Sequence, residues 1–337
     1  MADFLVIGAG SAGAHTAFFL KEAGCSVKVL EQKSIASGAS GAAGAFISPR
    51  LGKGGPLQRI TNEAFRFSTK FYKERFSHLF TQTGILRLPK DEKDAAKFKE
   101  QIPFINVAYE LKNSNEIDYL EPYAKEFGGI YFCEGGIADA HGICKALLEG
   151  IEVQEGVRVE DLEGLEAKNI VIATGAWDEL LPWYIELGRL AGSRIDAIGV
   201  ELPVSVHKRI SISKSFGGVV AIGATHRRVK SVEFFEDDIT MLVEEAERMS
   251  GRKIEVLRSY FGVRPSVNDH FPYAGVIRDQ SGSIVKGRYM IGGFGGRGFV
   301  FGAWVAKKLV DFILKDEPLP SEIDSDRYYK RWRKRHG

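Results

Sequence analysis

The segment FLVIGAGSAG at residues 4–13 constrains the fold of this chain more than any other part of it. Its first four residues are apolar and predict a buried strand. The glycines that follow, Gly8, Gly10 and Gly13, have the GxGxxG spacing of a dinucleotide-binding turn. In such a turn the three glycines permit a tight bend, close approach of backbone to a pyrophosphate, and close packing of helix on strand. A plain strand-to-helix turn is the alternative.

The residues after this turn supply the rest of a nucleotide-binding unit. Residues 14–23 predict a helix that ends at Gly24, and its first N–H groups carry a partial positive charge suited to phosphates. Residues 26–30 predict a second strand. Glu31 follows it, eighteen residues beyond Gly13, where an acid is expected to hydrogen-bond a ribose hydroxyl.

Composition narrows the class of protein. A chain of 337 residues is longer than a single hydrophobic core usually serves, so one large or two interleaved domains are expected. A hydrophobic content of 44% indicates a globular protein. A net charge of +2 does not by itself indicate a polyanionic partner. Three cysteines without CxxC spacing predict a reducing, cytoplasmic location, and the immediate entry into a strand predicts no signal peptide. The apolar stretch 299–314 contains charged residues, which favours a core helix over a membrane span.

Strand and helix signals alternate along the chain, which predicts an α/β fold. Helical spacing or capping is found at residues 60–79, 91–101, 139–148 and 237–250, and strand patterns are found at residues 169–175, 218–224 and 289–292.

A second glycine-rich loop occupies residues 292–298, again between a strand and a helix. Two such loops predict a ligand with two ends, phosphates at one and a redox ring at the other. A helix N-terminus beside a flavin would stabilise the anionic reduced ring. This loop must return to the first one in space, so the nucleotide domain is expected to be discontinuous. A tight packing turn is the alternative.

Seven segments resemble one known family in order along the chain. They are VIGAGSAG (6–13), VLEQ (29–32), SGASGAAGA (37–45), IVIATGAW (170–177), VVAIGATH (219–226), FGVRPSVNDHFPYAG (261–275) and GGFGGRGF (292–299). The chain thereby resembles the FAD-dependent amino-acid oxidases, the family that includes D-amino-acid oxidase, glycine oxidase and sarcosine oxidase. The resemblance implies FAD as cofactor, a Rossmann-like FAD-binding domain, and an α+β substrate domain built on an antiparallel sheet.

On this resemblance, we expect the FAD-binding domain at residues 1–75, 131–200 and 262–337, and the substrate domain at 76–130 and 201–261. Pyrophosphate is expected on the first loop, ribose on Glu31, adenine near Val159, and the flavin ring between residues 37–45 and 292–299. The residues predicted to bind FAD are Gly8, Gly10, Ser11, Ala12, Gly13, Glu31, Gln32, Ser40, Gly41, Val159, Thr174, Gly175, Gly295, Gly296, Arg297, Gly298 and Phe299.

Arg264 is the predicted catalytic-site residue for substrate. Pro265 restricts it to extended backbone, which directs its side chain away from a strand end. A guanidinium is the natural bidentate partner of a carboxylate. In the resembled family the matching arginine anchors the amino-acid carboxylate, so that role is implied for Arg264. An ion pair with a nearby acid such as Asp269 is the structural alternative.

Other candidate groups have simpler interpretations. The second arginine known near glycine oxidase substrates aligns with Gly296, so a backbone role around the flavin is expected for the loop that contains Arg297. His270 follows Asp269 in a sequence with turn chemistry, which we prefer over a general base. The histidines show no metal-ligand spacing, so no metal is predicted. Cys133 and Cys144 are expected to be small buried residues.

Within the family, residues 37–50, residues 63–72 and the GVRPSVNDHFP segment look most like the oxidase domain of the bifunctional enzymes that modify the wobble uridine side chain of tRNA. That likeness implies a carboxymethylaminomethyl substrate, in effect an N-substituted glycine. Residues 327–335 interleave six basic side chains with three aromatic ones, a composition that grips phosphates and stacks on bases. A solvated tail is the alternative interpretation.

The reaction expected from the resemblance is oxidation of a carbon–nitrogen bond. Arg264 would hold the carboxylate while hydride leaves the α-carbon for flavin N5, and water would hydrolyse the resulting imine. Three hypotheses remain open: oxidation of a small glycine-like amine, oxidation of a side chain carried by tRNA, and a flavin-bearing binding protein without turnover. None requires a membrane or a metal.

Overall fold

The computed structural model describes residues 2–229 and 235–336, which form two compact units. Unit 1 comprises residues 1–41, 140–190 and 263–337, and unit 2 comprises residues 42–139 and 191–262. The expected domain ranges placed residues 42–75, 131–139, 191–200 and 262 with the nucleotide half, whereas these residues pack within unit 2. Residues 1, 230–234 and 337, which fall inside the expected ranges, lie outside the described part. The roles expected for the two halves stay predictions.

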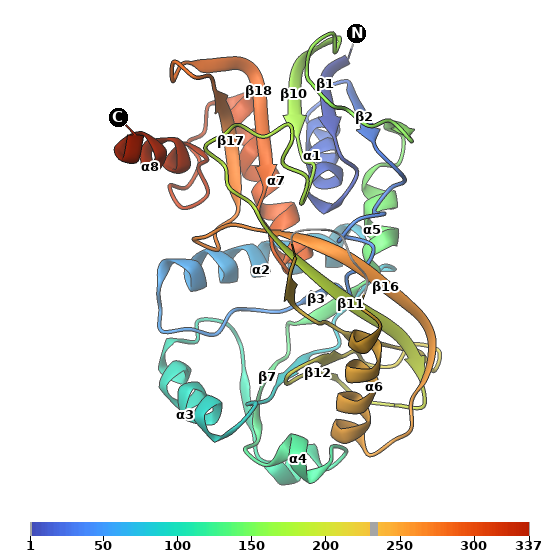
Figure 1. Cartoon of the computed structure of the whole chain (residues 1–337). Helices are drawn as coiled ribbons and strands as arrows, with labels where there is room; N and C mark the ends of the chain where they lie inside the picture. Colours follow the sequence, from blue (N-terminus) through green and yellow to red (C-terminus); the bar gives the residue numbers. More distant parts are fainter. Residues whose placement is uncertain (1, 230–234, 337) are drawn as a thin grey trace. The chain divides into compact units, whose positions relative to one another are not determined.

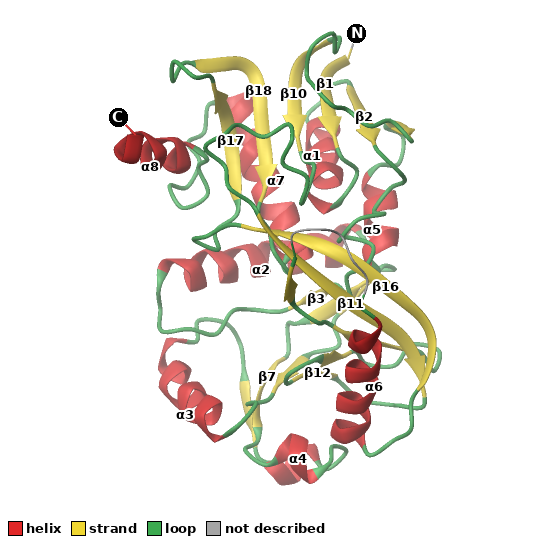
Figure 2. Ribbon diagram, viewed as in Figure 1, coloured by secondary structure: helices red, strands yellow, loops and turns green. Residues whose placement is uncertain are grey.

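Unit 1 is built of strands and helices from three segments of the chain (Figures 1 and 2). Its elements are β1 (Ala2–Ile7), α1 (Ser11–Glu22), β2 (Val27–Glu31), α5 (Ala140–Leu147), β9 (Glu152–Glu155), β10 (Ala167–Ile172), β17 (Tyr273–Arg278), β18 (Ile284–Gly292), α7 (Gly298–Lys315) and α8 (Asp326–His336).

The sheet of unit 1 has the strand order β17-β18-β10-β1-β2-β9. All neighbouring pairs are parallel except β17–β18, which is an antiparallel hairpin. Because β1 lies between β2 and β10, the chain crosses from one side of β1 to the other. Ligands bind at such a switch point, beyond the carboxyl ends of the strands. The expected Rossmann-like arrangement is therefore confirmed.

Alternation along β1 places its side chains on two faces of this sheet. Leu5 and Ile7 join Leu30 and Ile170 in a core cluster, against which Val159 and other side chains of irregular segments pack. On the opposite face, a Cβ at Gly13 of α1 would lie 3.3 Å from Val6 Cγ1, so α1 covers that face. Helices α1 and α7 lie together on this side (Figure 1).

Unit 2 contains a twisted sheet with helices at its periphery (Figure 2). Its elements are β3 (Phe46–Ile47), α2 (Pro56–Arg75), β4 (Phe80–Thr81), β5 (Ile85–Arg87), α3 (Glu92–Gln101), β6 (Glu110–Lys112), α4 (Pro122–Lys125), β7 (Gly129–Phe132), β8 (Gly136–Ala138), β12 (Ser205–His207), β13 (Ser211–Ile212), β14 (Val220–Gly223), β15 (Arg227–Arg228) and α6 (Glu236–Ser250).

Two long strands, β11 (Gly188–Ile198) and β16 (Glu255–Ser266), start or end in unit 1 and continue in the sheet of unit 2. The order of that sheet is β15-β11-β14-β13-β12-β5-β7-β6, with β16 beside β11. The pairs β11–β14, β12–β13, β5–β7 and β6–β7 are antiparallel, whereas β5 and β12 run parallel. The predicted antiparallel sheet is thus present, and it includes the parallel pair β5–β12.

Three elements differ from the sequence-based expectation. Helix α2 spans Pro56–Arg75 rather than residues 60–79. The last strand of unit 1, β18, begins at Ile284 rather than at residue 289, because pairing with β17 in the hairpin extends it. The basic C-terminal segment is an ordered helix, α8, and not a solvated tail. Its Tyr328 is 8% exposed and packs in a core cluster with Tyr273 and Tyr184. No helix of the described residues has the length and apolarity to cross a membrane.

Candidate cofactor and substrate site

The first glycine turn is closed by the packing of the chain on itself. Gly8 has a φ of +108°, and its N–H donates to the Leu30 carbonyl at 2.8 Å. A Cβ at Gly8 would lie 2.4 Å from the Ala173 carbonyl oxygen, and one at Gly13 would lie 1.9 Å from the Gly8 carbonyl oxygen. Both positions therefore require glycine whether or not a ligand is present.

Gly10 is in a different situation. Its backbone is extended, and the nearest atom to a Cβ there would be Ser40 Oγ at 3.2 Å. That Oγ accepts a hydrogen bond from the Ser11 N–H at 2.9 Å, at the start of α1. The loop that carries Ser40 and Gly41 folds back onto the first turn, since the Ala36 N–H donates to the Ala9 carbonyl. A Cβ at Gly10 would therefore be in tight contact with one side-chain oxygen, and not with a backbone carbonyl as at Gly8 and Gly13, beside a helix N-terminus.

Glu31 ends β2 against the same turn. Its Oε2 accepts from the Ala9 N–H at 2.8 Å and its Oε1 from the Lys33 N–H at 3.0 Å. The side chain is only 8% exposed. Gln32 follows it and is half-buried, while Val159 packs against the core cluster that contains Leu30. Glu31 therefore holds the turn and β2 together, and each of its oxygens retains capacity to accept a ligand hydroxyl.

Thr174 and Gly175 follow β10 at the same edge of the sheet. The Ala173 N–H donates to the Ile7 carbonyl, which joins the ends of β10 and β1. Thr174 Oγ1 donates to the Trp177 carbonyl at 2.6 Å, and Gly175 has a φ of +65° with no atom within 4 Å of a Cβ position. The turn at Gly175 is thus set by backbone conformation and is open on its outer side.

The second glycine loop has a packed half and an open half. A Cβ at Gly292 would lie 2.5 Å from the Tyr273 hydroxyl oxygen. At Gly296, in contrast, the nearest atom would be Arg264 Cδ at 3.9 Å. Helix α7 then begins at Gly298, with Arg297 at its N-cap and no side chain capping the first turn. Its N-terminal backbone therefore presents a partial positive charge at the open half of the loop.

Arg264 lies on β16 beside this open half. The neighbouring Pro265 carbonyl accepts from the Gly295 N–H at 2.9 Å, which fixes the end of β16 to the loop. Burial lowers the pKa of the Arg264 guanidinium. Asp269, the acid suggested as a local partner, is ion-paired with Arg327 of α8 at 3.1 Å. Arg264 is therefore a cation held in a partly dehydrated place.

A link between the two glycine loops was not predicted from the sequence. Ser11 Oγ donates to the Gly298 carbonyl at 2.7 Å, and His15 Nδ1 lies 2.7 Å from the Ser11 carbonyl. A Cβ at Gly302 would lie 2.5 Å from Ser11 Oγ and 2.8 Å from His15 Nδ1. Burial lowers the pKa of His15 to about 4, so the imidazole is neutral. A glycine inside an apolar helix was the available signal for this close packing.

The structure places the remaining candidates in a turn and at buried or partly buried positions. His270 has a φ of +62° in a turn, and its N–H donates to the Val267 carbonyl. Asp269 Oδ1 accepts from the Phe271 N–H in the same turn. Cys144 is buried and Cys133 is partly buried. Among the described residues, no group of His, Cys, Asp and Glu has the arrangement of a metal site.

Residues 3–312 match the model of a family described as FAD dependent oxidoreductase. This match covers most of the chain, so the protein belongs to that family, in which enzymes oxidise their substrates with FAD. The sequence-based assignment is confirmed.

A curated relative is the tRNA 5-methylaminomethyl-2-thiouridine biosynthesis bifunctional protein MnmC of Maricaulis maris. It is 28% identical over 330 residues, which cover 93% of this chain and 52% of that protein. The chain therefore spans about half the length of this relative.

Solved structures share the fold. Glycine oxidase from Bacillus cereus has a TM-score of 0.80 at 21% identity, with 94% of this chain and 96% of that chain covered. L-proline dehydrogenase from P. horikoshii has a TM-score of 0.81 at 18% identity, with 98% of both chains covered. These likenesses support the fold of the whole chain.

Proposed function

We propose that this chain binds FAD along the carboxyl ends of β1, β2, β10 and β18 and oxidises the C–N bond of a carboxylate-bearing amine. The family supports FAD as cofactor, and the residues fit it. Gly10 is the N-cap of α1, whose partial positive charge suits phosphates. Glu31 has acceptor capacity for ribose, and the start of α7 offers partial positive charge for the ring.

The observation that carries the substrate assignment is the position of Arg264. Its side chain runs past Gly296, at the open half of the second glycine loop, in a place where burial lowers its pKa. A carboxylate that enters there replaces lost hydration with charge-assisted hydrogen bonds to the guanidinium. Binding of this kind selects amines that carry a carboxylate and fixes their orientation.

Positioning is the contribution of the chain's own residues to the reaction. Bound FAD supplies the acceptor for the hydride that the substrate's α-carbon loses. Arg264 holds the carboxylate in one orientation, and an uncharged amine supplies the lone pair that forms the imine. Fixing the reacting atoms in this way is worth on the order of 7–11 kcal/mol in favourable cases. Hydrolysis of the imine by water then completes the C–N cleavage.

Anaerobic reduction of the bound flavin tests this proposal. Glycine and sarcosine are added to the FAD-loaded protein without oxygen, and loss of the visible flavin absorbance is followed. In Arg264→Ala the half-saturating amine concentration is expected to rise about 100-fold, because about 3 kcal/mol of charge-assisted binding is lost. For Arg264→Lys this concentration should lie between those of the unaltered protein and of Arg264→Ala, since a lysine keeps the charge but not the bidentate geometry.

The flavin content of both variants is the control and is expected to equal that of the unaltered protein. If both reduce their flavin with unchanged concentration dependence, Arg264 does not bind the substrate.

A second candidate function is oxidation of a carboxylated amine carried on tRNA. The named activity of the MnmC relative, tRNA 5-methylaminomethyl-2-thiouridine biosynthesis, favours it, as do the exposed cations of α8. Anaerobic flavin reduction by undermodified tRNA, but not by glycine or sarcosine, would select this function over the first. Reduction by the free amines alone would select the first.

A further inference from the structure

Helix α8 is fixed to unit 1 by its aromatic side chains. Tyr329 contacts Tyr184 edge-on with ring centroids 5.6 Å apart, and Trp332 contacts Trp183 in the same way at 5.8 Å. Because these rings are engaged with the protein, base stacking on them is not their main role. The expectation that both aromatic and basic residues of this segment face a ligand is therefore corrected: the aromatic residues and Arg327 anchor the helix, and most of the other basic residues are exposed.

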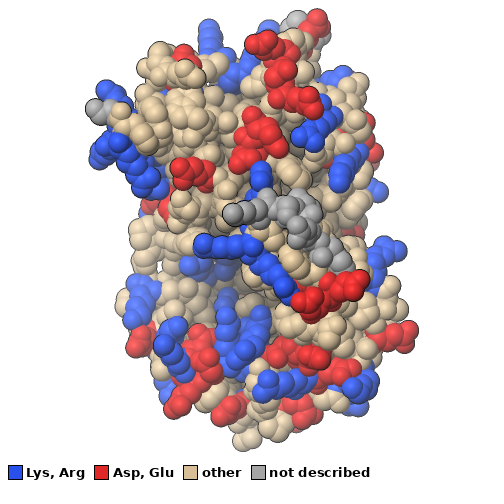
Figure 3. All heavy atoms as spheres, viewed as in Figure 1, with Lys and Arg blue, Asp and Glu red and all other residues tan. Residues whose placement is uncertain are grey.

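The exposed cations of α8 include Lys330, Arg333, Lys334 and Arg335. In Figure 3 basic side chains gather around this helix, at the left of the view. Within the described residues, none of the four has an acidic side chain within ion-pair distance, whereas Arg327 and Arg331 share Asp269. Residues three or four apart on a helix are neighbours, so Lys330, Arg333 and Lys334 form a row along α8, and Arg335 lies to one side of it.

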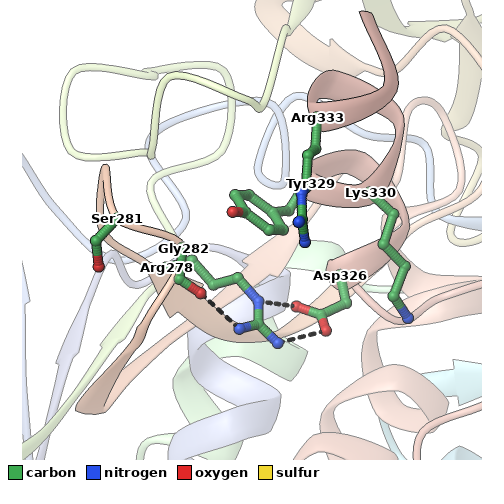
Figure 4. A pocket seen from close by; sticks show the side chains of 7 residues that line it. All are labelled: Arg278, Ser281, Gly282, Asp326, Tyr329, Lys330 and Arg333. Carbon is green, nitrogen blue, oxygen red and sulfur yellow. Dashed lines mark hydrogen bonds and ion pairs between the residues drawn. The ribbon is translucent and has the colours of Figure 1, made fainter. Parts of the chain in front are cut away.

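A pocket of about 370 Å³ opens beside this row. One wall is the turn between β17 and β18, with Arg278 and Gly282, and the other is α8, with Tyr329, Lys330 and Arg333 (Figure 4). A Cβ at Gly282 would lie 2.0 Å from the Tyr329 hydroxyl oxygen. The turn can therefore approach α8 this closely only with glycine at that position.

The charged side chains that line the pocket differ in their ion pairing. Arg278 donates from Nε and Nη2 to the two oxygens of Asp326, each at 2.7 Å, and from Nη1 to the Gly282 carbonyl at 2.8 Å. This pair is neutral and forms one side of the pocket. Lys330 and Arg333 lie beside it, as Figure 4 shows, and leave a formal surplus of two positive charges. A doubly charged or polymeric anion of small cross-section fits this arrangement.

We propose that this pocket binds a phosphate group of an RNA strand through Lys330 and Arg333, while Lys334 and Arg335 contact the neighbouring phosphate groups. The continuation of the cations beyond the pocket favours a polymer over an isolated anion. An anionic membrane is disfavoured, because the aromatic face that would insert into lipid packs against Trp183 and Tyr184. The choice of RNA rests on the second candidate function.

Binding of an unmodified tRNA transcript to the full-length, FAD-loaded protein tests the proposal. Fluorescence anisotropy is measured at several salt concentrations for the unaltered protein and for two double variants, K330E/R333E and K93E/K97E. The second pair makes the same change of charge on exposed positions of α3. We expect K330E/R333E to weaken binding at least about ten-fold and to reduce the salt slope by about two, and K93E/K97E to stay within about two-fold.

A third double variant distinguishes binding in the pocket from general electrostatic attraction of RNA to α8. K334E/R335E changes the charge of α8 equally, outside the pocket, and should weaken binding less than K330E/R333E. Equal losses in all three double variants would overturn the pocket, as would unchanged binding in K330E/R333E with an unchanged melting temperature. Binding of the unaltered protein to vesicles containing phosphatidylserine, but not to tRNA, would overturn the assignment to RNA.

The oxidoreductase proposal is judged separately in the same preparations. Flavin content and anaerobic reduction by free amines of the unaltered protein report on it, with no RNA present. A protein that reduces its flavin with sarcosine and ignores tRNA would refute the RNA site alone. A protein that binds tRNA and shows no flavin reduction by any amine or tRNA would refute the proposed function alone.

Discussion

The two glycine-rich loops of unit 1 look alike in sequence but differ in what requires their glycines. In the first loop, a Cβ at Gly8 or Gly13 would overlap a backbone carbonyl oxygen, at 2.4 and 1.9 Å. In the second loop, a Cβ at Gly295 or Gly296 would have its nearest atom at 4.0 or 3.9 Å. The first loop is closed by the protein itself, whereas the open half of the second is not.

This difference separates two reasons for glycine in a binding loop. Where a side chain would collide with the protein, glycine serves the fold, and substitution is expected to lower stability. Where space is available, as at Gly296, glycine keeps a surface clear for something that the chain binds. The same motif therefore contains positions for folding and positions for the ligand, and substitutions distinguish them.

The largest effect is expected for Gly13→Ala. The added methyl would lie 1.9 Å from the Gly8 carbonyl oxygen, so α1 and the turn must separate. We expect the free energy of unfolding of the cofactor-free protein to fall by at least about 3 kcal/mol, measured by chemical denaturation. Gly38→Ala is the matched control, because nothing lies within 4 Å of a Cβ at Gly38. Equal stability of the two variants would contradict the comparison.

The second prediction concerns His15, which lies where the two glycine loops are linked, and the dependence of stability on pH. His15 has a pKa of about 4 in the folded protein, below its ordinary value of 6.5, because it is buried. As the pH falls from 6.5 towards 4, the unfolded chain takes up a proton that the folded protein excludes. Stability should therefore fall by about 3 kcal/mol over that range through this residue, with no effect above it.

The measurement is the free energy of unfolding against pH for the unaltered protein and for His15→Gln. Carboxylate contributions are shared by both proteins and cancel in the difference. The variant should lose less stability between about pH 6.5 and about pH 4. Parallel curves would show that His15 is not kept neutral by the packing of α1 on α7.

The smallest effect on stability is expected for Gly296→Ala. A Cβ there would be in ordinary contact with Arg264 Cδ at 3.9 Å, so the unfolding free energy should change by less than about 1 kcal/mol. Substrate binding should be weakened instead, and half-maximal flavin reduction should then require a higher amine concentration. A large loss of stability with unchanged substrate dependence would place Gly296 with the folding glycines.

The strand, turn and helix order of unit 1 was predictable because each step has a local signal. Residues 4–13 combine an apolar strand with a glycine spacing that few other structures require, and Glu31 follows at a fixed distance. Helix α6 likewise shows its apolar spacing and its Gly251 stop, where φ is +66°. Family resemblance added Arg264, whose neighbour Pro265 was the only local sign of its direction.

Contacts between distant segments were not predictable in this way. The hydrogen bond of Ser11 to Gly298 and the pairing of Arg278 with Asp326 join residues far apart in sequence. These residue types are common, and no periodic pattern in the sequence links the two members of either pair. The division of aromatic and basic roles along α8 depended on where Trp183 and Tyr184 lie, which the helix sequence alone does not contain.

Binding of FAD to the cofactor-free protein tests the central claim most directly. FAD is titrated into the unaltered protein and into Gly10→Val, and bound flavin is measured by its colour and by quenching of its fluorescence. The unaltered protein should become yellow with one FAD per chain. Gly10→Val should stay colourless while it still unfolds in one cooperative transition, because its side chain occupies the place of the pyrophosphate and presses on the Ser40 hydroxyl. An unaltered protein that remains colourless with excess FAD would contradict the account.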